Sequence, residues 1–166
     1  MLLLSGCASP PPDDGRHEAV APIAPGPVKP PPPRTLRAAW KFDSSQNECV
    51  AVAAAGSTSL RVTVRDEAPI RLVVVLAPVF TDTPAVVPLH FTGPAGNWQI
   101  TARRAGRNTL GVSLSDNNAA LSRVLVLLSG GTLEIGAPPH IIVTFAISPS
   151  DTNGQNWFDC ARQKAF

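Results

Sequence analysis

The sequence predicts a mainly β domain, either an antiparallel β-sandwich or a partly open barrel with one or two short helices, that follows a disordered proline-rich tether. Three observations lead to this prediction. Ten of the 18 prolines lie within residues 8–34. Residues 35–166 contain many short apolar segments separated by turn sequences, and several of these segments alternate between apolar and polar side chains as half-buried strands do. Only two short segments of this region have the spacing of a helix.

The prolines divide the chain into a tether and a domain. Residues 8–34 have almost no large apolar side chains, so burial cannot offset the entropy of ordering them, and we expect an extended, solvated segment. Residues 35–166 are sufficient for one modest core and form the predicted β-rich domain. This region has 11 Lys and Arg against 9 Asp and Glu and no basic stripe, which argues against nucleic acid as a partner.

The first half of the domain consists of predicted strands joined by polar turns. Strands are expected at residues 38–42, 49–55, 59–65 and 70–80, around His90, and at 98–102 and 109–115. Residues 59–65 alternate between apolar and polar side chains without exception. Residues 70–80 are apolar on both faces for several positions, which favours a central strand or one covered on both sides. Residues 103–108 predict a hairpin turn.

A change of period marks the first predicted helix. Its start has Asp116 or Asn117 as a capping residue, and its end has Gly130, which can adopt the left-handed conformation that terminates a helix. A strand over residues 123–128 is the alternative, because that stretch is continuously apolar except at its first position.

The chain then returns to strands and closes with a second helix. Strands are expected at residues 132–135 and 140–147, joined by a turn at 136–139. The helix is expected at residues 153–163 and places Trp157 and Cys160 three residues apart on one face. That face could pack on the sheet and bring Cys160 to Cys49.

The N-terminal residues Leu4, Ser5, Gly6 and Cys7 resemble the lipobox of bacterial lipoproteins, in which an apolar and two small residues precede a cysteine. The resemblance implies that Cys7 is diacylated and becomes the first residue of the mature protein, so that two or three acyl chains anchor it stably. Residues 1–6 are then the end of a signal peptide whose basic and longer apolar parts are missing. The alternative is a cytosolic protein with an apolar start.

The residue after the cysteine bears on localisation. Ala8 is not the Asp that retains lipoproteins in the inner membrane of enteric bacteria, so the resemblance implies a lipid anchor in the outer membrane, on the periplasmic face. At about 3.1 Å per residue, the tether of residues 8–34 could span on the order of 80 Å. The predicted partners are therefore the membrane, through the lipid, and an envelope protein.

Two cysteines remain if Cys7 is acylated. Cys49 and Cys160 lie near the two ends of the domain. An even number of cysteines in an oxidising compartment is typical of a disulfide. A disulfide between them would close a loop long enough to contribute about 4.7 kcal/mol. The alternatives are two buried thiols or an intermolecular bond, and a metal site is not expected because neither cysteine has another ligand at suitable spacing.

Enzyme motifs are largely missing from the sequence, so we expect neither catalysis nor a cofactor. His90 and His140 begin or lie within apolar strands, which favours structural over catalytic roles. Trp40, Trp98 and Trp157 lie in or beside ordered elements, which favours core packing over an exposed ligand platform.

The order of elements after residue 119, ending at Cys160, resembles the C-terminal half of the invasion-associated locus B family, and Trp40 followed by Cys49 is similar to that family's opening. The resemblance implies a secreted β-rich envelope factor. A lipoprotein inhibitor of lysozyme is another alternative, although its Ser-Gly-x-x-Tyr loop has no counterpart here: the segment at Ser129 lacks the aromatic residue. The leading prediction is a lipid-anchored, non-catalytic binding or scaffolding module.

Overall fold

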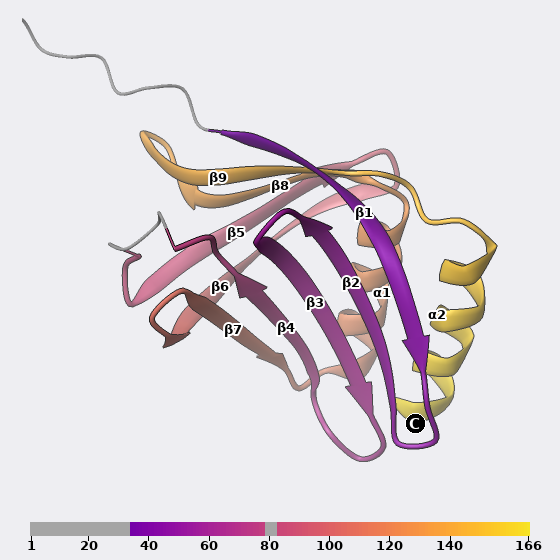
Figure 1. Cartoon of the computed structure of the whole chain (residues 1–166). Coiled ribbons are helices and arrows are strands. Elements are labelled where there is room, and N and C mark those ends of the chain that lie inside the picture. Colours follow the sequence, from indigo (N-terminus) through magenta and orange to yellow (C-terminus); the bar gives the residue numbers. More distant parts are fainter. Residues whose placement is uncertain (1–33, 79–82) are drawn as a thin grey trace, which may run out of the picture. The chain divides into compact units, whose positions relative to one another are not determined.

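The alternating segments of the domain form nine β-strands that close into a barrel, with two helices at one end (Figure 1). The computed structural model describes residues 34–78 and 83–166. The chain divides into two units, Met1–Pro31 and Pro32–Phe166, and all described residues belong to the second. Cys7 and the predicted tether therefore lie outside the described residues, apart from Arg34.

The strands and helices follow the predicted order. Their bounds are β1 Thr35–Ser44, β2 Glu48–Ala55, β3 Thr58–Arg65, β4 Ile70–Val75, β5 Val86–Gly93, β6 Gly96–Gly106, β7 Thr109–Leu114, α1 Asn117–Leu128, β8 Gly131–Ala137, β9 His140–Ile147 and α2 Thr152–Lys164. The mainly β fold with two short helices is confirmed, and of the two predicted architectures the barrel is present, in closed form.

The strand order around the barrel is β1-β2-β3-β4-β7-β6-β5-β8-β9, and β9 returns to β1. Neighbouring strands are antiparallel except for the closing pair. There, residues 35–38 of β1 run parallel to residues 144–147 of β9. The closing ladder is thus only four residue pairs long, whereas β1 continues to Ser44.

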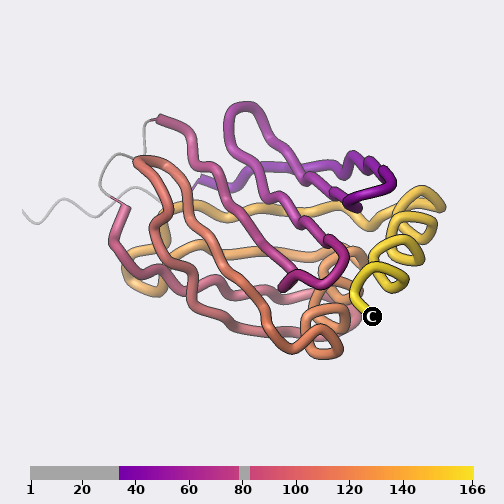
Figure 2. Tube along the Cα trace, turned by 90° about the horizontal axis from the view of Figure 1, so that it is seen from below, coloured from indigo at the N-terminus to yellow at the C-terminus, as the bar shows by residue number. Residues whose placement is uncertain are grey.

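The core fills the barrel and extends beneath the helices. On β3, Leu60, Val62 and Val64 are buried and the intervening residues face outward, as the alternation predicts. Figure 2 shows α1 and α2 together at one end of the barrel, while β1 begins at the other. Both helices contribute apolar residues to the same core, so they cover that end. No helix in the described part of the chain is long and apolar enough to span a membrane.

The structure settles two local predictions, the strand expected at residues 70–80 and the choice between helix and strand at residues 123–128. The strand expected at residues 70–80 ends at Val75, and positions 79 and 80 lie outside the described residues. Of the two predicted alternatives the central strand is confirmed, because β4 pairs with both β3 and β7, whereas its outer face is not covered and Val75 stays 38% exposed. The segment around residues 123–128 is helical. Asp116 caps α1 by accepting a hydrogen bond from the Ala119 N–H, and Gly130 follows its end at a φ of 82°.

Candidate functional site

A concave feature lies where β1 separates from β9. The last hydrogen bond between them runs from the Ser148 N–H to the Ala38 carbonyl, 3.1 Å long. The chain then turns away into the loop before α2, while β1 continues for six more residues paired with β2 alone among the described strands. A groove of about 470 Å³ opens between this part of β1 and α2.

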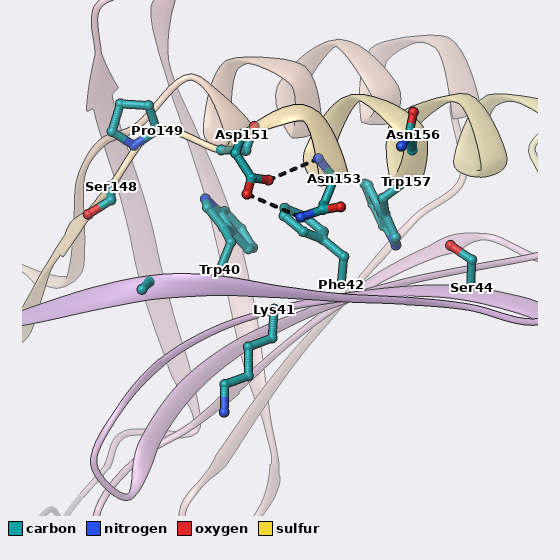
Figure 3. Close-up of a pocket in the computed structure, with 12 residues that line it drawn as sticks. Trp40, Lys41, Phe42, Ser44, Ser148, Pro149, Asp151, Asn153, Asn156 and Trp157 are labelled. Carbon is teal, nitrogen blue, oxygen red and sulfur yellow. Dashed lines mark hydrogen bonds between the residues drawn. The ribbon is translucent and has the colours of Figure 1, made fainter.

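We call this feature the β1–α2 groove. Its lining residues are Ala39, Trp40, Lys41, Phe42, Ser44, Ser148, Pro149, Ser150, Asp151, Asn153, Asn156 and Trp157 (Figure 3). They come from one strand, one loop and the first turns of one helix. Two of them, Trp40 and Trp157, are candidate residues from the sequence, and the fold brings them together.

Three aromatic rings form a row in the groove. Trp40 and Phe42 point from the same face of β1 and stack with ring centroids 5.8 Å apart, and the Phe42 ring lies 6.1 Å from that of Trp157 on α2. Figure 3 shows the row between the strand and the helix, with Lys41 on the opposite side of β1. The register sets Trp40 beside Ala53 and Phe42 beside Ala51, so small residues on β2 flank the large ones on β1.

Two hydrogen-bond donors in this row have no acceptor. The indole nitrogens of Trp40 and Trp157 are buried and make no hydrogen bond to any described residue. The third tryptophan differs, because Trp98 donates from Nε1 to the Arg123 carbonyl at 3.2 Å. An unsatisfied buried donor costs about 1–3 kcal/mol. The aromatic row therefore carries two buried N–H groups that no acceptor among the described residues satisfies.

The first turn of α2 forms the rim of the groove. Asp151 caps the helix through Oδ1, which accepts from the Asn153 N–H at 2.9 Å, and Oδ2 accepts from Asn153 Nδ2 at 3.2 Å. Gly154 lets the helix approach closely, because a Cβ there would clash with Ser150 Cβ and lie 3.1 Å from Phe42 Cζ. The rim thus depends on a glycine whose role the sequence alone did not reveal.

Covalent and polar contacts hold α2 against the barrel. The structure joins Cys49 on β2 to Cys160 on α2 in a disulfide, with the Cα atoms 6.2 Å apart. Lys164 Nζ donates to the Gln46 carbonyl at 2.6 Å and pairs with Asp66 at 3.2 Å. The helix wall of the groove is therefore fixed at its far end to the turns that flank β2 and β3.

The two described histidines lie outside the groove. His90 is on the outer face of β5, where its Nδ1 is 3.6 Å from Glu134 Oε2 on β8, and both side chains are partly exposed. His140 is exposed at the start of β9. Neither residue lines the β1–α2 groove. In the described part of the chain, no three His, Cys, Asp or Glu side chains gather as metal ligands.

The tryptophans are divided between packing and the groove. Trp157 is 1% exposed and belongs to the core, as predicted, and it is also one of the residues that line the groove. Trp40 and Trp98 are half-buried, and Trp98 stacks on Phe91 beneath α1. The prediction of core packing thus holds fully for Trp157, while Trp40 has both a packing role and a position in the groove.

Together these features define a small, closed, helix-capped β-barrel with an aromatic groove beside a partly unpaired strand. No protein-family model matches the chain, and neither a curated protein nor a solved structure matches it at a significant level.

Proposed function

We propose that the domain is a non-catalytic binding module and that its ligand site is the β1–α2 groove. The observation that carries this proposal is the row of three aromatic rings that lines the groove, in which the two buried indole N–H groups have no acceptor among the described residues. Aromatic faces and fixed donors supply binding energy and orientation for a ligand.

The chemistry of the lining supports binding rather than catalysis. Among the described residues that line the groove, the ionisable side chains are Lys41 and Asp151. Lys41 lies on the other side of β1, and Asp151 is engaged in capping α2 (Figure 3). The serine hydroxyls of the lining have no histidine beside them in the groove that could act as a base.

A photocrosslinking experiment tests the proposal. Ser148 is exposed on the loop at the groove, so p-benzoylphenylalanine placed there in the full chain should crosslink an envelope component in the producing cell. The same group at Arg162, which is exposed on α2 outside the groove, is the matched control. We expect a product from position 148 that is lost when Trp40→Ala is added. Equal products from both positions, or no effect of Trp40→Ala, would contradict the proposal.

We further propose that the module is carried on an acylated Cys7 at the periplasmic face of the outer membrane. The support is the Leu4, Ser5, Gly6 and Cys7 sequence followed by proline-rich residues. The envelope role that the resemblance to the invasion-associated locus B family implies stays a prediction, as does the lysozyme-inhibitor alternative.

Replacement of the proposed acylation site gives an all-or-none test. Cys7→Ala should abolish labelling by radioactive palmitate and move the protein from the membrane to the soluble fraction, because several acyl chains are the anchor. Cys160→Ala is the control and should keep both label and membrane association. Unchanged fractionation of the Cys7→Ala variant without any label in the wild type would show that no lipid anchor exists.

A further inference from the structure

We propose that the β1–α2 groove binds an extended polypeptide segment of a partner protein, which adds to the barrel as a strand along the unpaired edge of β1 at residues 39–44. The inference rests on the binding function proposed above and names its ligand class. An extended peptide can pair with backbone groups that a strand leaves free at a sheet edge.

The hydrogen-bond pattern shows which backbone groups are free. The carbonyls of Arg34 and Ala38 point toward β9. The Arg34 carbonyl accepts a hydrogen bond from the Thr144 N–H at 3.2 Å, and the Ala38 carbonyl accepts one from the Ser148 N–H at 3.1 Å. On the opposite side, the Ser45 N–H bonds to the Glu48 carbonyl at 2.9 Å, at the start of the β1–β2 turn. Even-numbered residues of β1 thus face β9 and odd-numbered residues face β2, because backbone groups alternate along a strand.

Beyond Ala38 the even-numbered residues of β1 have no strand to bond with among the described residues. The register of β1 with β2 continues without a shift from Ala39 to Ser44, so the alternation persists. The N–H and C=O groups of Trp40 and Phe42, and the N–H of Ser44, therefore point to the side that no described strand occupies. These same three residues line the groove, so the free edge opens into it.

A bound segment would continue the line that β9 begins. β9 covers residues 35–38 of β1 and the peptide would cover the next six, so the existing ladder is extended along one edge. Alternate side chains of the segment would face the row formed by Trp40, Phe42 and Trp157. Trp157 is 1% exposed, and its buried indole N–H has no acceptor among the described residues. Backbone pairing would supply affinity, and the aromatic row would supply side-chain preference.

Hydrogen exchange of the full chain, read at single amides by NMR, gives the first test. In the free protein the amides of Trp40 and Phe42 should exchange fast, and that of Lys41, which faces β2, should exchange slowly. Equal slow exchange at all three positions would overturn the proposal, because the edge would already be paired. Slow exchange at Trp40 and Phe42 that appears only at high protein concentration would overturn it too, in favour of a second copy of this chain as occupant.

The second test adds a probe, the acetylated octapeptide Lys-Thr-Val-Thr-Val-Thr-Val-Lys. At saturation it should slow the exchange of Trp40 and Phe42 by about tenfold or more and leave Lys41 unchanged. The same peptide with N-methyl groups on its six central amides cannot pair as a strand and should have no effect. Equal protection by both peptides, or none by either, would contradict strand addition.

A pair of variants isolates the backbone donor. Ser44→Pro removes an N–H on the free side of β1, whereas Ser44→Ala keeps it and removes the same hydroxyl. We expect octapeptide binding by Ser44→Pro to be about tenfold weaker than by Ser44→Ala. Equal binding by two folded variants would contradict the proposal, and if Ser44→Pro does not fold, the N-methylated peptide decides. Crosslinking from position 148 without any protection by the octapeptide would leave the binding function standing and overturn only strand addition.

Discussion

Loss of the Cys49–Cys160 disulfide should lower the free energy of unfolding by about 3 to 5 kcal/mol. The bond joins residues 111 positions apart, so it restricts the unfolded chain over most of the domain. It also fixes α2, which supplies one wall of the β1–α2 groove. The double variant Cys49→Ala, Cys160→Ala in a Cys7→Ala background is the one to measure, by urea denaturation against the same background with the disulfide intact.

Chemical reduction provides the control for this prediction. The reduced protein and the double variant should unfold at the same urea concentration, because both lack the crosslink and keep a small side chain at each site. Their common midpoint should lie below that of the oxidised protein. Identical midpoints before and after reduction would show that the disulfide does not stabilise the domain.

Truncation of Trp157 should be comparably damaging. Its side chain is 1% exposed and stands between α2 and β1, where it contacts the aromatic row through Phe42. Removal of a buried tryptophan side chain typically costs about 3 to 5 kcal/mol, through lost burial and the cavity that remains. We expect Trp157→Ala to fall in this range, and also to open the groove on its helix side.

Phenylalanine variants separate ring packing from hydrogen bonding. Trp157→Phe removes an N–H that has no acceptor, whereas Trp98→Phe removes one that bonds to the Arg123 carbonyl. Trp157→Phe loses only packing and should lower the free energy of unfolding much less than Trp157→Ala. Trp98→Phe should lower it by about 1 kcal/mol for the lost hydrogen bond, in addition to the loss of packing. Thermal and urea unfolding of the three variants checks the order. A Trp157→Phe variant as unstable as Trp157→Ala would contradict it.

Much of the fold was predictable because local patterns encode it. The strict alternation at residues 59–65 set the inward face of β3, and Asp116 with Gly130 marked the limits of α1. Trp157 and Cys160 on one helical face indicated how α2 would dock. The predicted length of β4 was wrong because an apolar run does not indicate where pairing ends: Val75 pairs with Thr109, the first residue of β7.

The groove was not predictable from local patterns. It exists because β9 leaves β1 after Ala38, and that separation depends on the register of two strands about 100 residues apart in the chain. Gly154 and Asp151 also become meaningful only when α2 lies against β1. The segment at residues 38–42 was predicted as a strand, but nothing in it distinguishes a paired edge from a free one.

The parallel closure of the barrel also gives the domain a direction. Nine strands cannot all be antiparallel to both neighbours around a ring, since alternation requires an even number, and the one exception falls between β1 and β9. Both strands consequently start at the end away from the helices. Arg34 and the groove are therefore at opposite ends of β1, so a segment bound in the groove would lie away from the first residues of that strand.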